Sequence, residues 1–355
     1  VVAWGTYQRV EEKFCFLVCR NSEVKHMVNI KKMKMQLLAT LASVMVTAFA
    51  LTSATYAWYV TNNRVEATTT NISATANGFI LQIATADQGP QHGGEQTSLV
   101  ASTNGGKISP SSTNDLISWY VCEGWNGEGK VTSYRTPTFT TKTEDPNVKP
   151  GQYGDIKDPH YAYLKSEYVL YTITETGLAD VYLDASEGSP ITLSANGTPT
   201  TDTIPKSMRI GITIQNIKKN ADNKYIDDGE EELKVVYAPY EETGKGNDAE
   251  ARDGWTCIGN GTDGKLKPVA VTYPYIYATT YTDQNNQNWV ATKVGKNYEV
   301  SSGTQKIASS VGYDGVKMRV YIWMEGTDAD CVNNAAAEDP ATYNVNVKLA
   351  GISAE

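Results

Sequence analysis

Hydrophobic and polar residues alternate along two segments of the chain. Met208–Ile214 (MRIGITI) and Val316–Met324 (VKMRVYIWM) each place large apolar side chains at every second position. A period of two residues is that of a β-strand with one buried face. Alternation or a short apolar run predicts further strands at Gly78–Ala84, Tyr168–Ile173, Ala179–Leu183, Leu233–Tyr237, Val269–Tyr277 and Tyr343–Leu349.

These strands predict an all-β fold. No segment keeps an apolar period of 3.6 residues over three turns, so the crossover helices that a parallel sheet needs are not expected. Tyr, Thr and Val are frequent in the runs, with Gly, Asn and Asp between them, which favours strands joined by turns. We expect an antiparallel two-sheet sandwich of the jelly-roll type.

Long polar segments separate the predicted strands. They are Asp87–Asn114, Lys142–Pro159, Glu241–Gly264 and Tyr281–Ser310. We interpret them as long loops or small hairpins inserted into one domain that covers residues 58–355. The alternative is a boundary between two domains near residues 142–160.

The N-terminal region has the three parts of a secretory signal peptide. A basic cluster (Lys31–Lys34, KKMK) precedes the apolar run Leu37–Ala50, and small residues follow it in TSATYA. We predict a signal-peptide helix within residues 27–57, with cleavage between Ala57 and Trp58.

Other interpretations of this region remain open. Cleavage after Ala54 is a second candidate, and a membrane anchor that extends to Val60 is the alternative to cleavage. Threonines and a serine dilute the second half of the stretch, which favours a signal peptide. Residues 1–26 would then be a non-native or misassigned extension.

Acidic residues outnumber basic ones. The chain has 31 Lys and Arg against 40 Asp and Glu; seven basic and three acidic residues precede residue 58, which leaves a formal net charge of −13 for the predicted mature region. Binding to nucleic acid needs clustered Lys and Arg, because the polymer carries a phosphate at every step. We expect no nucleic-acid partner.

Three cysteines follow the predicted leader: Cys122, Cys257 and Cys331. An odd number in an exported chain allows one disulfide with a free thiol, or no disulfide at all. The sequence leaves the pairing open.

The chain lacks recognisable catalytic motifs. His92 and His160 are the histidines of the predicted mature region, and we expect both on exposed loops. No HExxH zinc motif, serine-hydrolase elbow or phosphate loop occurs. We therefore expect a protein that is not an enzyme and carries no cofactor.

Two acidic segments are candidates for cation binding. Asp222–Glu232 lacks the ligand spacing of a calcium loop, and a hairpin tip at Asp227–Gly229 explains it, with weak Ca²⁺ binding as the alternative. The sequence EGTDAD holds three further carboxylates, Glu325, Asp328 and Asp330, which could bind a metal ion. We favour an acidic turn, because Asp and Gly are ordinary turn residues.

Tryptophans offer a second kind of candidate site. Trp119, Trp125, Trp255 and Trp289 would stack on sugar rings if they were exposed on loops. Aromatic residues are also favoured within strands and at protein contacts. The sequence alone does not separate these interpretations.

Residues Lys31–Ile83 resemble exported proteins of the TasA/camelysin type with a SipW-type signal peptide, from Gram-positive bacteria. The resemblance rests on the Lys-rich start, the short apolar run and Ala54–Tyr59 (ATYAWY). Trp323–Cys331 (WMEGTDADC) resembles a segment of clostridial proteins with such a leader. The resemblance implies cleavage by a dedicated signal peptidase. Camelysin-like members have been described as metalloproteases, but the zinc motif is missing here, so that activity is not carried over.

The resemblance also implies a jelly-roll subunit of an extracellular fibre. In TasA-like fibres the segment after the leader adds as a strand to the neighbouring subunit. Here that segment is Trp58–Glu66, continuing toward Ala76, with Trp58, Tyr59 and Val60 as its buried side chains. The alternative is a flexible lead or an ordinary first strand of a monomer.

Together these features predict a secreted or cell-surface structural protein. We expect a subunit of an extracellular filament or biofilm matrix that self-associates through its N-terminal strand. The alternative function is a monomeric surface adhesin or glycan-binding module that uses loop aromatics.

Overall fold

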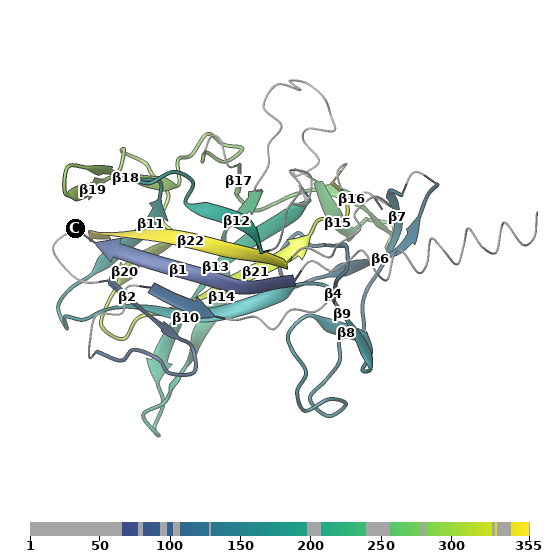
Figure 1. The fold of residues 1–355 in the computed structure, drawn as a ribbon, viewed down its shortest axis with the longest axis horizontal. Helices are drawn as coiled ribbons and strands as arrows, with labels where there is room; N and C mark the ends of the chain where they lie inside the picture. Colours follow the sequence, from purple (N-terminus) through teal and green to yellow (C-terminus); the bar gives the residue numbers. More distant parts are fainter. Residues whose placement is uncertain are drawn as a thin grey trace, which may run out of the picture. The chain divides into compact units, whose positions relative to one another are not determined.

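The computed structural model describes residues 66–76, 81–92, 98–101, 107–127, 129–196, 207–238, 256–277, 281–328, 331 and 342–354. The chain divides into two units, residues 1–60 and 61–355, and all described residues belong to the second. The predicted signal peptide and its Ala57–Trp58 cleavage site therefore lie outside the described residues, as do Tyr59, Val60 and Asp330. The part that is described is all-β, as predicted, with twenty-two strands and no helix (Figure 1).

The larger sheet has eight strands and brings the two ends of the described chain together. β1 (Glu66–Ala76) lies between β22 (Thr342–Ser353) and β3 (Ser98–Ala101). β22 also pairs with β11 (Ala179–Asp184) and β12 (Ile191–Asn196). The remaining strands of this sheet are β18 (Val290–Val294), β19 (Asn297–Glu299) and β20 (Ala308–Val311).

The second sheet has six strands in the order β17-β14-β13-β21-β10-β2. Its centre is β13 (Met208–Lys219) beside β21 (Val316–Met324). The others are β2 (Leu81–Thr85), β10 (Leu164–Thr172), β14 (Tyr225–Ala238) and β17 (Tyr275–Tyr277).

Three small sheets lie partly in the long polar segments and partly beside them. They are β5-β6-β7 (Ser111–Ser112, Tyr120–Trp125, Val131–Arg135), β4-β9-β8 (Lys107–Ile108, Asp158–Tyr161, Gln152–Asp155) and the hairpin β15-β16 (Thr256–Asn260, Leu266–Ala270). Tyr281–Ser310 differs, because β18, β19 and the start of β20 come from it and belong to the eight-stranded sheet.

The two large sheets share one core. A single buried cluster combines Ile210 and Val320 of the six-stranded sheet with Val181 and Val347 of the eight-stranded sheet. In β13 and β21 every apolar residue predicted to face one side belongs to this cluster. The alternation therefore identified the inner face correctly, and the arrangement is sandwich-like.

The outer face of the six-stranded sheet is also buried in part, which the alternation did not predict. Arg209, Thr213, Arg319, Tyr321 and Trp323 point away from the shared core, yet each is buried. A second cluster explains this for Tyr321 and Trp323, which pack with residues of the small sheets. Part of this cover, from Leu116 to Ala162, lies more than 150 residues before Tyr321 in the sequence, so the strand sequences hold no local sign of it.

The large sheets are not antiparallel throughout, unlike the antiparallel sandwich expected from the sequence. β1 pairs with β22, β11 with β18, and β14 with β17 in parallel. A parallel pair needs a long connection between its strands, which is often a helix. For β1 and β22 the connection is the body of the fold itself, so no crossover helix is needed.

Several predicted strand boundaries also need correction. The first predicted strand, Gly78–Ala84, corresponds to β2 at Leu81–Thr85, with residues 78–80 outside the described part, and β1 precedes it. Val269–Tyr277 is divided into β16 and β17. The hairpin tip lies at Asn220–Lys224, where Asn223 has a positive φ and Asn220 N donates to Lys224 O, so Asp227–Gly229 belongs to β14.

Candidate functional site

Two hairpins and one loop enclose a groove of about 700 Å³. One wall is β7, from Lys130 to Tyr134, and the other is β16, from Lys265 to Pro268. The floor is Gly326–Asp328, the loop that follows β21 and belongs to the EGTDAD segment. The hairpins β6–β7 and β15–β16 both lie toward the right of Figure 1.

Glu325 anchors this floor from below. Its side chain is only 2% exposed and accepts hydrogen bonds from Trp323 Nε1 at 3.1 Å and Thr327 N at 3.2 Å. Ser112 adds a side-chain hydrogen bond. Burial raises the pKa of the Glu325 carboxyl, although these donors and Arg209 oppose the shift.

Glu325 also joins the floor to the β15–β16 wall. Ser112 Oγ, which bonds Glu325, accepts a hydrogen bond from Ile258 N at 2.7 Å. Thr327 Oγ1 lies 3.0 Å from both Thr256 O and Glu325 Oε1, so its single proton serves one of these acceptors at a time. The buried carboxylate therefore sets the position of β15 relative to the loop.

Gly326 and Tyr134 meet where the floor joins the other wall. A Cβ atom on Gly326 would lie 2.7 Å from Tyr134 Oη, so only glycine allows this approach. Burial raises the pKa of the Tyr134 phenol well above its ordinary value, with the nearby Glu325 acting in the same direction. Tyr134 is therefore a neutral hydroxyl at the edge of the groove.

Asp328, the acidic residue on the floor, forms an ion pair with Arg209. The Arg209 side chain is 2% exposed and lies 5.5 Å from the centre of the Tyr275 ring, and its Nη1 donates to Met208 O at 3.0 Å. The carboxylate of Asp328 is thus compensated by a buried guanidinium.

These contacts place two of the three carboxylates singled out from EGTDAD. Glu325 points into the protein and Asp328 pairs with Arg209, while Asp330 lies outside the described residues. Within the described part of the chain, no three His, Cys, Asp or Glu side chains are placed to hold a metal ion.

The three cysteines lie on the elements around this site, and all are buried free thiols. Cys122 is in β6, Cys257 is in β15, and Cys331 N donates to Asp328 O at 2.9 Å. Burial raises the pKa of the Cys122 and Cys257 thiols to about 12 each, and that of Cys331 well above its usual value. They are protonated at neutral pH and unreactive as nucleophiles.

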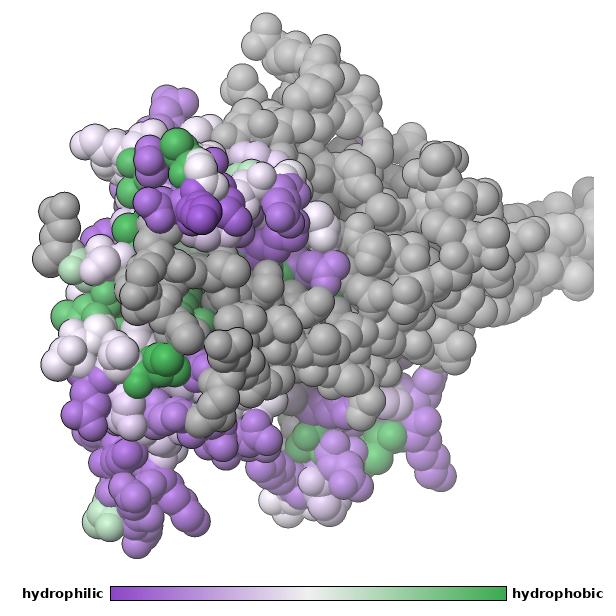
Figure 2. All heavy atoms as spheres, turned by 60° about the vertical axis from the view of Figure 1, so that its left-hand side comes forward, coloured by the Kyte–Doolittle hydropathy of each residue, from purple (hydrophilic) through white to green (hydrophobic). Residues whose placement is uncertain are grey.

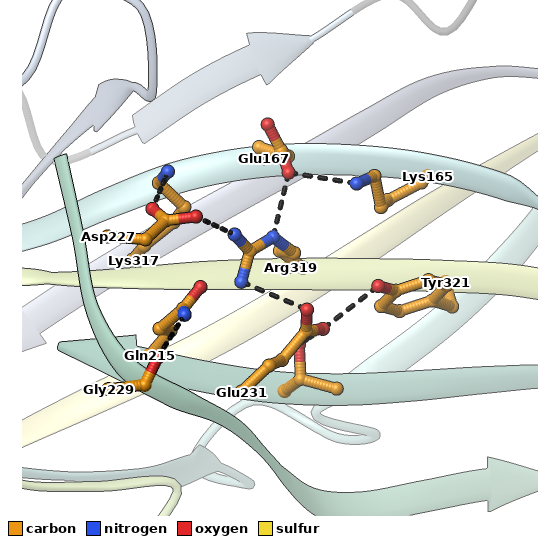
Figure 3. A network of polar contacts seen from close by, with 10 residues as sticks. Lys165, Glu167, Gln215, Asp227, Gly229, Glu231, Lys317, Arg319 and Tyr321 are labelled. Atoms are coloured by element: carbon orange, nitrogen blue, oxygen red, sulfur yellow. Dashed lines mark hydrogen bonds and ion pairs between the residues drawn. The ribbon is translucent and has the colours of Figure 1, made fainter. Parts of the chain in front are cut away.

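A second polar cluster lies on the outer face of the six-stranded sheet (Figure 3). Arg319 Nε lies 2.7 Å from Glu167, Nη2 2.9 Å from Asp227 and Nη1 3.1 Å from Glu231. Lys165 and Lys317 extend the network to either side, and Tyr321 donates to Glu231 at 2.9 Å. Three carboxylates surround one guanidinium, which fits a structural link between β10, β21 and β14.

The tryptophans do not form an exposed aromatic surface. Trp119 and Trp289 are 3% and 4% exposed, and Trp119 stacks on Tyr163 with ring centres 4.3 Å apart. Trp125 is half-buried, and Trp255 lies outside the described residues. For Trp119 and Trp289, the interpretation as loop residues that stack on sugars is therefore wrong.

The histidines are less exposed than expected. His92 stacks on Tyr313 with ring centres 3.5 Å apart, and His160 Nδ1 lies 3.1 Å from Ser109 Oγ. Both are half-buried. Neither ring nitrogen of His92 has a hydrogen-bond partner among the described residues, so His92 lacks the pairing expected of a catalytic base.

The sequence indicated the floor of the groove but not its walls. EGTDAD was singled out, whereas Lys130, Lys265 and Lys267 were not, because they are far apart in sequence and each looks like an ordinary surface lysine. The one signal in the sequence for a role of these lysines was that they are basic residues in a chain with more acidic than basic residues.

Comparison with family models, with curated proteins and with solved structures finds no match to this chain. Among the described residues, no helix has the length and apolar character needed to cross a membrane.

Proposed function

We infer that this chain is a secreted structural protein of a Gram-positive cell surface or matrix. In this proposal a jelly-roll-like, non-catalytic subunit self-associates into filaments by exchange of β1. The observation that carries it is the pairing of β1 with β22 at ten positions, from Glu66↔Thr342 to Ala76↔Gly351.

The position of β1 favours exchange between subunits. The next strand, β2, belongs to the other large sheet, and four residues separate Ala76 from Leu81 in the sequence. A short link therefore joins β1 to the rest of the fold. The partners of β1 are β22 on one side and β3 on the other. An identical strand from a second subunit would make the same backbone contacts, so exchange changes little in contact energy.

Serial exchange would yield an open chain of subunits. When each subunit donates β1 to the next, the contact is head-to-tail, and such a contact continues without closing unless the rotation forms a ring. This places the exchanged strand at Glu66–Ala76, downstream of the Trp58–Glu66 segment expected from the sequence.

The exposed apolar side chains of the described residues are dispersed, so association through backbone pairing fits them better than association through an apolar patch. The large hydrophobic residues exposed in the described part of the chain are scattered over five segments: Ile117, Ile156, Leu178, Ile226 and Val294. Figure 2 shows one face on which the described residues are mostly hydrophilic. Scattered single residues of this kind do not form an association patch.

Cysteine cross-linking tests the exchange. Asn71 and Asn346 are paired positions, and neighbouring strands lie about 4.8 Å apart, within reach of a disulfide. In filaments of the Asn71→Cys/Asn346→Cys chain, we expect oxidation to link different chains and to give a ladder of multimers on a non-reducing gel. Electron microscopy of the same sample should show filaments.

The control is the Asn71→Cys/Ser353→Cys chain, whose cysteines are seven positions out of register and should not link. The native cysteines are buried and protonated, so they should not interfere. If the in-register pair gives only an internal disulfide at high protein concentration, and filaments are not seen, exchange of β1 is wrong.

A further inference from the structure

The groove between β7 and β16 differs in charge from the rest of the molecule. Three lysines line it, Lys130, Lys265 and Lys267, while the carboxylate in its lining is Asp328, which Arg209 compensates. Lys267 also lies 3.9 Å from Asp263, which is outside the lining; this pair is exposed and therefore weak, so the lining itself keeps an excess of positive charge. The chain as a whole carries a formal net charge of −9. A positive concavity in an acidic protein attracts anions and repels the protein's own surface.

The rest of the lining fits a hydroxyl-rich ligand. Thr132 and Ser133 are exposed on β7 and offer hydroxyls, and the neutral Tyr134 hydroxyl lies beside them. Leu266 and Pro268 provide apolar surface on the opposite wall. The volume of the groove, about 700 Å³, is within the roughly 300–1,000 Å³ that is usual for ligand sites.

The open edge of β16 makes an added peptide strand a poor occupant. Pro268 is paired with Ile258 of β15. Because proline has no N–H, the edge of β16 that faces the groove lacks a backbone donor at this position. Proline and lysine on an edge strand are the common protection against strand addition. An extended peptide would therefore gain few backbone hydrogen bonds from this wall.

The groove is held in shape before any ligand arrives. Its floor rests on buried Glu325, and hydrogen bonds through Ser112 and Thr327 connect that carboxylate to β15. A preformed site loses less conformational entropy when it binds. Lysine ammonium groups held on a preformed site suit anionic groups that are spaced along a polymer.

We propose that this groove binds an acidic polysaccharide, a hydroxyl-rich chain that bears carboxylate or phosphate groups. The lysines contact the anionic groups, the hydroxyls of β7 bond the sugar or polyol, and Leu266 and Pro268 cover its apolar face. This binding is independent of β1 and would attach each subunit to a surrounding acidic glycan.

The test measures binding of the purified full chain to immobilised polymers at low and high salt. Polygalacturonate supplies carboxylates, a poly(glycerol phosphate) polymer supplies phosphates, dextran is the neutral control, and polyglutamate is an acidic polymer without sugar. We expect binding to one or both acidic glycans, weakened by salt, and the two arms identify which anionic group is preferred.

Two variants of equal charge change locate the site. Lys130→Gln/Lys265→Gln/Lys267→Gln should weaken glycan binding by roughly tenfold or more. Lys218→Gln/Lys219→Gln/Lys224→Gln alters the distant β13–β14 hairpin and should change binding by less than about twofold. All six lysines except half-buried Lys130 are exposed, so both variants should keep the melting temperature of the parent chain.

The proposal is overturned if neither acidic glycan binds, if dextran binds as well as they do, or if the distant variant loses as much affinity as the groove variant. Equal binding of polyglutamate would also overturn it, because charge alone would then explain the attraction. These outcomes do not depend on filament formation, so failure here leaves strand exchange untouched.

Discussion

Glu325 shows how a single residue can control the geometry of a surface loop. Both of its oxygens accept hydrogen bonds, from Trp323 Nε1 on one side and Thr327 N on the other. Neither donor can reverse its role, since an indole N–H and a peptide N–H only donate. The site therefore requires an oxygen with a free lone pair at both positions, which a carboxyl provides whether ionised or protonated and a glutamine amide does not.

Replacing Glu325 with Gln should destabilise the protein by about 1–3 kcal/mol, because the amide NH₂ would face a donor. Burial raises the pKa of Glu325, so its stabilising effect is greatest below the unfolded pKa and declines as pH rises through the folded pKa. Urea unfolding should thus show a larger loss at pH 5 than at pH 8. Glu230→Gln, at an exposed position of β14, is the control. Equal stability of the Glu325→Gln and parent chains would contradict this role.

At the scale of strands, Arg319 of β21 is linked to two other strands of the six-stranded sheet, to β10 through Glu167 and to β14 through Asp227 and Glu231. Desolvation would raise the pKa of Glu167, but Arg319 and Lys165 outweigh it, and the pKa is lowered. A carboxylate with a lowered folded pKa contributes stability above its unfolded pKa, and this is lost as pH falls through the folded value.

Arg319→Met should therefore cost about 1–3 kcal/mol near neutral pH, a figure reduced because the carboxylates are partly exposed. The loss arises because three carboxylates would remain without their cation. The stability that ionised Glu167 contributes is lost as pH falls through its lowered folded pKa, so the difference between the two unfolding curves should become smaller at acid pH. Lys218→Met, which breaks an exposed pair with Asp228, should change stability by less than about 0.5 kcal/mol. A difference that does not depend on pH would rule out the electrostatic explanation.

The same strands show how far the sequence predicts the fold. Alternation gave the inner faces of β13 and β21, since an apolar residue at every second position has few other uses in a soluble chain. It failed for the outer faces, because Arg209 and Arg319 have the composition of a solvated face and are covered by distant segments. The groove lysines were missed for a related reason: their significance depends on two hairpins meeting, which no local pattern encodes.

At the scale of the molecule, the first and last described strands lie side by side in the larger sheet. Paired positions such as Glu66 and Thr342 are separated by most of the described chain. No periodicity reports such a contact, so the sequence predicts strands but not the parallel pairing of β1 with β22. Because β1 lies between β22 and β3, its loss would leave one backbone edge of each strand without a partner.

Removal of β1 should therefore weaken the entire fold, and a peptide should restore it. We expect a chain that begins at Asn77 to melt at a lower temperature, because the edges of β22 and β3 lose their partner. Addition of a Glu66–Ala76 peptide should raise the melting temperature as its concentration rises, following mass action for a ligand of the folded state. A scrambled peptide of the same composition should have no effect.

The complemented chain should remain monomeric, because it accepts a strand and has none to donate. That outcome separates two roles of β1 that stability alone would confuse: completion of the sheet and connection of subunits. If the chain from Asn77 is as stable as the parent and ignores the peptide, β1 is not integral to the sheet. If it still forms filaments, another surface joins the subunits, and exchange of β1 is not the mode of assembly.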